Sequence, residues 1–179
     1  MFLITRPIAE SNELIALLAD KRIVATHLPL MSIVPCQKFS LGDIDAIKNA
    51  KVVFITSPTT VTYAQELIKL LANNVQIIAA GQSSATRVHD VNPNLKVISH
   101  AMAGVQEIIA TGVFNDVSEI LILGGNEPNE RLIKYCEEQQ IKYHFICAYQ
   151  RVDLIALNKL EIENIIFANQ LSGVVITSS

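Results

Sequence analysis

The segment Val53-Phe54-Ile55-Thr56-Ser57 decides the fold, and it recurs near the end of the chain as Val174-Val175-Ile176-Thr177-Ser178. Each copy is an unbroken apolar run that ends in two hydroxyl side chains. Such a run is typical of a parallel strand that is covered on both faces. In open α/β sheets, ligands bind beyond the carboxyl ends of these strands, so both pairs of hydroxyls stand where a site is expected.

Short β-type apolar runs alternate with helical stripes along almost the whole chain, which predicts βαβ units and a parallel sheet. Helices are expected over the stripe of Leu14, Leu17 and Leu18, after a Ser40 cap, over Val61 to Leu71 and over Ile162 to Ile166. Strands are expected at Phe2–Thr5, Ile23–Leu28, Val52–Thr56, Val75–Ala80, Leu95–Ile98, Ile120–Leu123, Tyr143–Ala148 and Val174–Thr177.

Two extended passages break this rhythm. The stretch His27–Pro35 is bracketed by prolines and has no helix of its own, and Ala148–Val152 separates a strand from a fresh helix. They predict two connections around a continuous middle domain, residues 35–151, with residues 1–34 and 152–179 combining into a discontinuous outer domain. We therefore expect two flavodoxin-like or Rossmann-like α/β domains, the outer one incomplete because no helix follows its last strand.

The composition of the 179 residues excludes several classes of protein. Half of the residues are hydrophobic, 17% are charged and the net charge is −3, so there is a core but no basic surface for nucleic acid. The N-terminus lacks the pattern of a signal peptide, and no apolar run reaches the roughly 18 residues of a membrane span. The three cysteines and four histidines have no metal-type spacing. We expect a soluble cytoplasmic protein without membrane, nucleic-acid or metal partners.

Glycine and serine residues follow several of the predicted strands. Gly81 opens a helix directly after a strand, so main-chain N–H groups would converge there and form an anion cradle. The alternative is that Ser83 or Ser84 only caps that helix. Gly104 and the pair Gly124-Gly125 repeat the arrangement, which favours binding along one edge of the sheet.

Other candidates lie at the ends of elements. Thr56-Ser57 precedes Pro58, which suits the first position of a helix, so capping alone would also explain the hydroxyls. Arg6 carries a fork of donors that fits carboxylates, although an arginine is more often a surface residue. Tyr149 stands where the middle domain ends, either with its phenol in a cleft or as a packing aromatic.

Two enzyme classes receive little support. The chain contains neither GxGxxG nor the GxxxxGK[ST] loop, so nicotinamide and ATP chemistry have no motif. The segment Gly81–Ala85 approaches the GxSxG elbow of hydrolases, but its last glycine is missing and no suitable acid and histidine follow.

Taken together, these positions resemble the uroporphyrinogen-III synthase family. The resemblance runs in order through Thr5-Arg6-Pro7, Leu28-Pro29-Leu30, Val53 to Pro58, Ala80-Gly81 with Ser84-Ala85, Ala101 and Gly104, Leu121 to Leu123 with Gly125, Arg131-Leu132, Tyr149 with Arg151, and Thr177-Ser178.

The resemblance implies two α/β domains and a cleft for a linear tetrapyrrole. The implied enzyme is a hydro-lyase of porphyrin and heme biosynthesis that needs no cofactor and closes hydroxymethylbilane to uroporphyrinogen III with inversion of the last ring. By the same resemblance Tyr149 assists departure of the hydroxyl, Ser84 takes a position usually held by threonine, and Gly124 stands where arginine is common. The implied substrate-binding positions are Arg6, Thr56, Ser57, Gly81, Ser83, Ser84, Gly104, Gly125, Thr177 and Ser178.

The resemblance also sets an expectation about length. Family members continue past the second Thr-Ser with further elements and a second Gly-x-x-Thr loop, and the complete proteins are expected to be monomers. For this chain we expect impaired turnover, together with self-association through apolar faces and strand edges left uncovered. The alternative is a non-catalytic α/β module that binds an anionic ligand and converts nothing.

Overall fold

The computed structural model describes residues 1–36, 38–99, 104–168 and 171–175. The chain divides into two compact units. Unit 1 comprises Met1–Val34 and Arg151–Ser179, and unit 2 comprises Pro35–Gln150.

The larger sheet has six strands in the order β3-β8-β7-β4-β5-β6. Five of them pair in parallel, from β8 through β7, β4 and β5 to β6. Together with the helices between them they confirm the predicted α/β class. The strands are β3 (Met31–Pro35), β4 (Val52–Ile55), β5 (Gln76–Ala79), β6 (Lys96–Ser99), β7 (Glu119–Gly125) and β8 (Lys142–Asp153).

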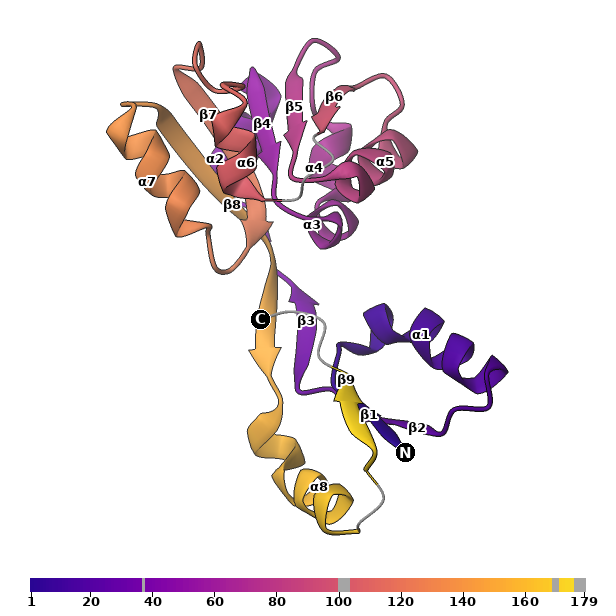
Figure 1. Cartoon of the computed structure of the whole chain (residues 1–179). Coiled ribbons are helices and arrows are strands. Elements are labelled where there is room, and N and C mark those ends of the chain that lie inside the picture. The colour runs from indigo at the N-terminus through magenta and orange to yellow at the C-terminus, as the bar shows by residue number, and fades with distance from the viewer. Residues whose placement is uncertain (37, 100–103, 169–170, 176–179) are drawn as a thin grey trace. The chain divides into compact units, whose positions relative to one another are not determined.

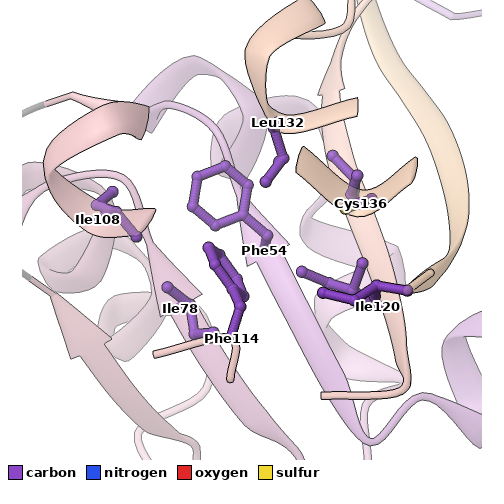
Figure 2. Close-up of a cluster of buried hydrophobic side chains, with 9 residues drawn as sticks. Phe54, Ile78, Ile108, Phe114, Ile120, Leu132 and Cys136 are labelled. Atoms are coloured by element: carbon purple, nitrogen blue, oxygen red, sulfur yellow. The ribbon is translucent and has the colours of Figure 1, made fainter. Parts of the chain in front are cut away.

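Both faces of the central strands β4, β5 and β7 are covered. On one face Phe54, Ile78 and Ile122 pack with Ile108 and Leu132 of α6 and α7, and Figure 2 shows this cluster around the Phe54 ring. The next residues along each strand point the other way, toward a layer of α2 to α5 in which α3 packs on α5. The helices are α2 (Leu41–Asn49), α3 (Pro58–Tyr63), α4 (Gln65–Lys69), α5 (Gln82–Val91), α6 (Val105–Ala110) and α7 (Glu130–Glu138).

The Ser40 cap is present as predicted. The Ser40 Oγ accepts from the Asp43 N–H at 3.1 Å, and the Asp43 carboxylate accepts from the Ser40 N–H at 2.9 Å, which makes a capping box at the start of α2. His144 of β8 also contacts Asp43, with 2.9 Å between Nε2 and Oδ1. Burial raises the pKa of the Asp43 carboxyl, but the hydrogen bonds from His144 and Ser40 outweigh burial and hold the pKa below its usual value.

Unit 1 contains a second, three-stranded sheet in the order β2-β1-β9, with β1 paired in parallel to both neighbours. Figure 1 shows β9 in yellow beside β1 in indigo, although they come from opposite ends of the chain. The elements are β1 (Phe2–Ile4), α1 (Ile8–Asp20), β2 (Ala25–His27), α8 (Ile155–Phe167) and β9 (Gly173–Val175). The predicted last strand therefore begins as expected, and its residues Ile176 and Thr177 lie outside the described part.

Three expectations about the elements need correction. The predicted helix from Val61 to Leu71 is two helices, α3 and α4, separated at Ala64. Residues 59–62 of α3 are all β-branched, which lowers their helix propensity.

The predicted core stripe of α1 is also wrong in part. The Leu17 side chain is 56% exposed, whereas Ser11 is buried and donates to the Pro7 carbonyl at 3.0 Å.

The third correction concerns His27–Pro35, which we expected only as an extended connection. Residues 31–35 of this stretch form strand β3, which lies beside β8 in the larger sheet (Figure 1). The Leu154 N–H donates to the Leu30 carbonyl at 2.8 Å, and the Cys36 N–H donates to the Ala148 carbonyl at 3.1 Å. These two bonds run in opposite residue order on the two strands, as in antiparallel pairing.

The Phe54 cluster is expected to dominate the stability of unit 2. Phe54 is fully buried, and its ring centroid lies 6.0 Å from that of Phe114 in an edge-on arrangement. We expect Phe54→Ala to lower the free energy of unfolding by about 3–5 kcal/mol, because it removes apolar contacts and leaves a cavity. Urea unfolding would measure this as a lower midpoint.

A control for that variant is Leu41→Ala, because the Leu41 side chain is 81% exposed. Its free energy of unfolding should change by no more than about 0.5 kcal/mol. Equal losses in the two variants would contradict the assignment of the core to the Phe54 cluster.

Candidate functional site

The carboxyl ends of the parallel strands meet at one edge of the larger sheet. This edge carries Tyr149 on β8, Gly125 on β7, Thr56 after β4 and Gly81 after β5, and these strands are neighbours in that order. The Thr56 N–H donates to the carbonyl of Leu123 in β7 at 3.2 Å, which extends the ladder past the end of β4. Residues far apart in sequence are thus brought to one edge, where ligands bind in folds of this class.

A chain of hydroxyl groups lies at this edge. The Thr60 Oγ1 is 3.0 Å from both the Thr56 Oγ1 and the Ser57 Oγ, and the Ser57 Oγ is 3.5 Å from the Tyr149 hydroxyl. The Ser57 Oγ also accepts from the Thr60 N–H at 3.1 Å, so Ser57 caps α3 as its sequence position suggested. The hydroxyls of Thr56 and Ser57 are therefore held in fixed positions by Thr60.

Thr60 itself was not among the predicted site residues. It is fully buried, and its hydroxyl contacts both predicted hydroxyl residues. The signal in the sequence is its spacing, because Thr60 follows Thr56 by four residues and Ser57 by three, which places all three on one side of a helical first turn.

Tyr149 is enclosed on several sides. Its side chain is 2% exposed, and its ring centroid lies 5.8 Å from that of Tyr63 on α3. The backbone of Gly125 approaches the ring so closely that a Cβ on Gly125 would lie 2.8 Å from the Tyr149 Cζ. The phenol is therefore held at the sheet edge by the rest of the site, beside the Ser57 hydroxyl.

Gly124 stands where the resembled family commonly has an arginine, and its close neighbours bear on this difference. A Cβ at Gly124 would lie 3.1 Å from the Phe145 ring and 3.2 Å from the Thr56 Oγ1. Any side chain at this position would require Phe145 and Thr56 to shift by a few tenths of an ångström, so the arginine that the resemblance places there would have to be accommodated by such a shift.

The helices that begin at this edge differ in their caps. Ser57 caps α3, and the Asn129 Oδ1 accepts from the Leu132 N–H at 3.1 Å and caps α7. Helix α5 begins at Gly81, and no side chain in the described part of the chain caps it. The expected alternative of a Ser83 or Ser84 cap is therefore wrong, since both serines lie inside the first turn, with Ser83 exposed and Ser84 buried. Within the described residues, no side-chain oxygen caps the N–H groups at the start of α5.

Gly104, which was also predicted to bind an anion, lies in a different environment from Gly81. Gly104 precedes α6, and a Cβ on Gly104 would overlap the carboxylate of Glu107, which therefore lies over the start of α6. A hollow of about 390 Å³ lies here, and the residues that line it include Gly104, Glu107, Asn129, Glu130 and Arg131. Arg131 adds a cation to this hollow beside the two acidic side chains, but the Glu107 carboxylate already lies over the start of α6 where the sequence suggested an anion cradle.

The remaining predicted positions belong to unit 1. The Arg6 carbonyl accepts from the His27 Nε2–H at 2.8 Å and from the Ser11 hydroxyl at 3.3 Å, so the Arg6 backbone is tied to β2 and α1. Thr177 and Ser178 lie outside the described residues.

Within the described ranges there is neither a candidate metal centre nor a candidate membrane span. No group of three or more His, Cys, Asp or Glu side chains there is arranged to hold a metal ion. None of the helices in that part of the chain combines the length and the apolar character that crossing a membrane requires.

The contact between Gly125 and Tyr149 can be tested by adding one methyl group. We expect Gly125→Ala to lower the free energy of unfolding by about 1–3 kcal/mol, because the new Cβ must displace the Tyr149 ring. Urea unfolding and near-ultraviolet circular dichroism of the tyrosines would measure the loss and the displacement.

The matched control for this variant is Gly42→Ala inside α2, where the new Cβ would meet only the Ser40 Oγ at 3.6 Å. This substitution should leave the stability unchanged or raise it by up to about 1 kcal/mol, because alanine favours the helix. A Gly125→Ala protein as stable as wild type, with an unchanged tyrosine spectrum, would show that the ring is not held by this contact.

The chain was compared with known proteins. No curated protein matched it. Among solved structures it is similar to a mutant uroporphyrinogen III synthase from the extremely thermophilic bacterium Thermus thermophilus, with a TM-score of 0.70, 12% identity and coverage of 97% of this chain and 71% of that one. For a second structure of a Thermus thermophilus uroporphyrinogen III synthase, the TM-score is 0.56 and the identity 13%, with coverage of 98% of this chain and 72% of that one. For the uroporphyrinogen-III synthetase from Helicobacter pylori 26695, the TM-score is 0.50 and the identity 17%, with coverage of 85% of this chain and 62% of that one. At these identities the structures show a shared fold.

The comparison with family models is more specific. The model described as uroporphyrinogen-III synthase HemD matches residues 12–179, which is nearly the whole sequence. The predicted resemblance is thereby confirmed: this chain belongs to the uroporphyrinogen-III synthase HemD family.

Proposed function

We propose that this chain is a hydro-lyase of tetrapyrrole biosynthesis that closes hydroxymethylbilane to uroporphyrinogen III with inversion of the last ring. Membership of the family supports the reaction, and the arrangement at the carboxyl edge of unit 2 supports the assignment of roles. The single observation that carries these roles is the buried Tyr149 phenol beside the Ser57 hydroxyl, at the end of parallel strands.

The proposed role of Tyr149 is to assist departure of the substrate hydroxyl. Its phenol donates a hydrogen bond to that hydroxyl, which leaves as water when it takes up a proton. Ser57 and Thr60 keep the phenol oriented through the chain of hydroxyl contacts. The cation left on the substrate is then attacked by its last ring, and the protein decides the isomer by holding the two ends of the substrate in one geometry.

The proposed anchor for the substrate carboxylates is the start of α5. The chain has a net charge of −3, so overall charge does not attract an acidic tetrapyrrole. The first turn of α5 instead offers main-chain N–H groups that face no capping side chain in the described structure, and the exposed Ser83 adds a hydroxyl. Such a helix start stabilises a carboxylate through hydrogen bonds and the helix dipole.

The test is an assay that separates uroporphyrinogen isomers made from hydroxymethylbilane. The wild-type chain should produce more of the type III isomer than a protein-free control. We expect Tyr149→Phe to reduce the rate of type III formation by at least about tenfold, because the hydroxyl group that assists the leaving group is lost. Tyr143→Phe is the matched control and should leave the rate unchanged, since Tyr143 lies near the opposite end of β8 and is 40% exposed.

A second pair of variants in the same assay tests the hydroxyl chain. Thr60→Val keeps the shape of the side chain and removes its hydroxyl, so the rate should fall by less than in Tyr149→Phe, whereas Thr60→Ser should retain it. A chain that binds a linear tetrapyrrole but produces only the isomer ratio of the protein-free control would instead be the non-catalytic binding module.

We further propose that this chain self-associates through unit 1. The side chains of Leu160 and Phe167 are 72% and 75% exposed, and their seven-residue spacing places them on the same face of α8. Sedimentation velocity should show oligomers that increase with protein concentration, and replacing both residues by glutamate should reduce them. Leu41→Glu, at an exposed leucine of unit 2, should have no such effect. A wild-type chain that stays monomeric at all concentrations would refute this proposal.

A further inference from the structure

Two cysteines that lie far apart in sequence meet where β3 ends beside β8. The Cys36 N–H donates to the Ala148 carbonyl at 3.1 Å, and the Cys36 side chain lies close enough to that of Cys147 to raise the pKa of the Cys147 thiol. Both cysteines are half-buried free thiols. Since Cys36 follows β3 and Cys147 lies within β8, the fold alone brings the pair together.

A bulge in β8 shapes this contact. In the pairing of β7 with β8, Gly124 is opposite Cys147 and Gly125 is opposite Tyr149, so Ala148 is an extra residue. A bulge breaks the alternation of side chains along a strand and redirects the residues beside it. The Cys147 thiol in addition donates to the carbonyl of Tyr149 at 3.2 Å. The cysteine pair is thus connected to the proposed catalytic residue through hydrogen bonds.

The surroundings decide the order in which the two thiols react. Burial raises the pKa of Cys147 to about 12, and the neighbouring Cys36 sulfur acts in the same direction. Cys147 is therefore a poor nucleophile in the reduced pair, because the thiolate is the reacting form. Once Cys36 carries a disulfide, its sulfur can no longer be a thiolate, and the thiolate of Cys147 becomes easier to form.

The third cysteine is placed differently. Cys136 is 1% exposed in the Phe54 cluster and is labelled in Figure 2 on α7. Burial, followed by the charge of Glu137, raises the pKa of its thiol. It therefore reacts slowly with reagents in solution and does not compete with the pair.

We propose that Cys36 and Cys147 form a dithiol site that a small disulfide such as glutathione disulfide converts reversibly into an intramolecular disulfide. The Cys36 thiolate attacks one sulfur of glutathione disulfide, the S–S bond breaks and one glutathione thiolate leaves. The Cys147 thiolate then attacks the sulfur of Cys36 in the mixed disulfide and releases the second glutathione. The two thiol protons end on the two glutathione thiols, and the dithiol is oxidised by two electrons while glutathione disulfide is reduced.

This bond would act on β8 next to the proposed site. It ties β8 to the segment after β3 at a position two residues before Tyr149. It also removes the thiol hydrogen that Cys147 donates to the Tyr149 carbonyl. The inference does not depend on the proposed activity, because it rests only on the contact between the two cysteines.

The experiment equilibrates the folded full chain in buffers of increasing glutathione disulfide content, quenches it with acid, and then unfolds it in urea to label every free thiol with a maleimide. Under oxidising conditions we expect the protein to lose the mass of two hydrogens and to take up one label, which peptide mapping places on Cys136. Dithiothreitol should restore three labelled cysteines. A folded chain that keeps three free thiols, or that retains glutathione on Cys36, would overturn the proposal.

Three variants separate this site from general thiol reactivity. Cys136→Ala is the matched control and should form the same disulfide as wild type. In Cys147→Ser the reaction should stop at a glutathione adduct on Cys36, and Cys36→Ser should gain no disulfide. The same treatment in urea gives the reference for the unfolded chain. A bond that forms only in urea, or that involves Cys136 in the folded chain, would show that the fold does not create the site.

The oxidised and reduced forms can also be compared by urea unfolding after the oxidant is removed. The bond closes a loop of about 110 residues, so the oxidised form should unfold at a higher urea concentration. The midpoints of the two single-cysteine serine variants should not respond to oxidation. An oxidised wild-type chain with a lower midpoint would mean that the bond strains the native contact, which would contradict a preformed site.

Discussion

The structure of unit 2 depends on the parallel register of β4 with β7 and β5. Ile55 pairs with Leu123 on one side and with Ala79 on the other, so β4 and β5 end in step while β7 continues to Gly125. Two further bonds, from the Thr56 N–H to the Leu123 carbonyl and from the Ala80 N–H to the Ile55 carbonyl, extend the ladder one residue past the ends of β4 and β5. A shift of one residue would turn Phe54 to the opposite face and remove it from the core. The same shift would move the hydroxyl residues away from the edge, so the core and the site are set by one register.

Strand β8 departs from that register where the site is most crowded. The bulge at Ala148 and the missing side chain at Gly125 together let the Tyr149 ring lie against the backbone of β7. A regular strand would direct consecutive side chains to alternate faces, and a larger residue at Gly125 would occupy the space of the ring. The position of the phenol therefore follows from a local irregularity of two neighbouring strands, and the hydroxyl chain through Ser57 and Thr60 depends on that position in turn.

Patterns that act over a few residues predicted much of this fold. The apolar runs located the expected strands, and Ser40 as a cap identified the start of α2. What could not be predicted depends on partners distant in sequence. The strand character of residues 31–35 comes from pairing with β8, and the approach of Cys36 to Cys147 comes from the same pairing. At the candidate site, their place directly after a buried apolar run singled out Thr56 and Ser57, whereas the carboxylate of Glu107 over Gly104 depends on side-chain conformation that no sequence pattern records.

The sheet of unit 1 joins the first strand of the chain to its last described strand, with Phe2 opposite Gly173 and Ile4 opposite Val175. During synthesis on the ribosome, β1 emerges long before its partner exists, and all of Pro35–Gln150 is made in between. Unit 2 consequently has every residue that it needs to fold while the nascent chain is still attached. Unit 1 can pair β1 with β9 only when residues 173–175 arrive, after all residues of unit 2 have been made. Because unit 2 is inserted between the two segments of unit 1, all residues of unit 2 are made before those of unit 1 are complete.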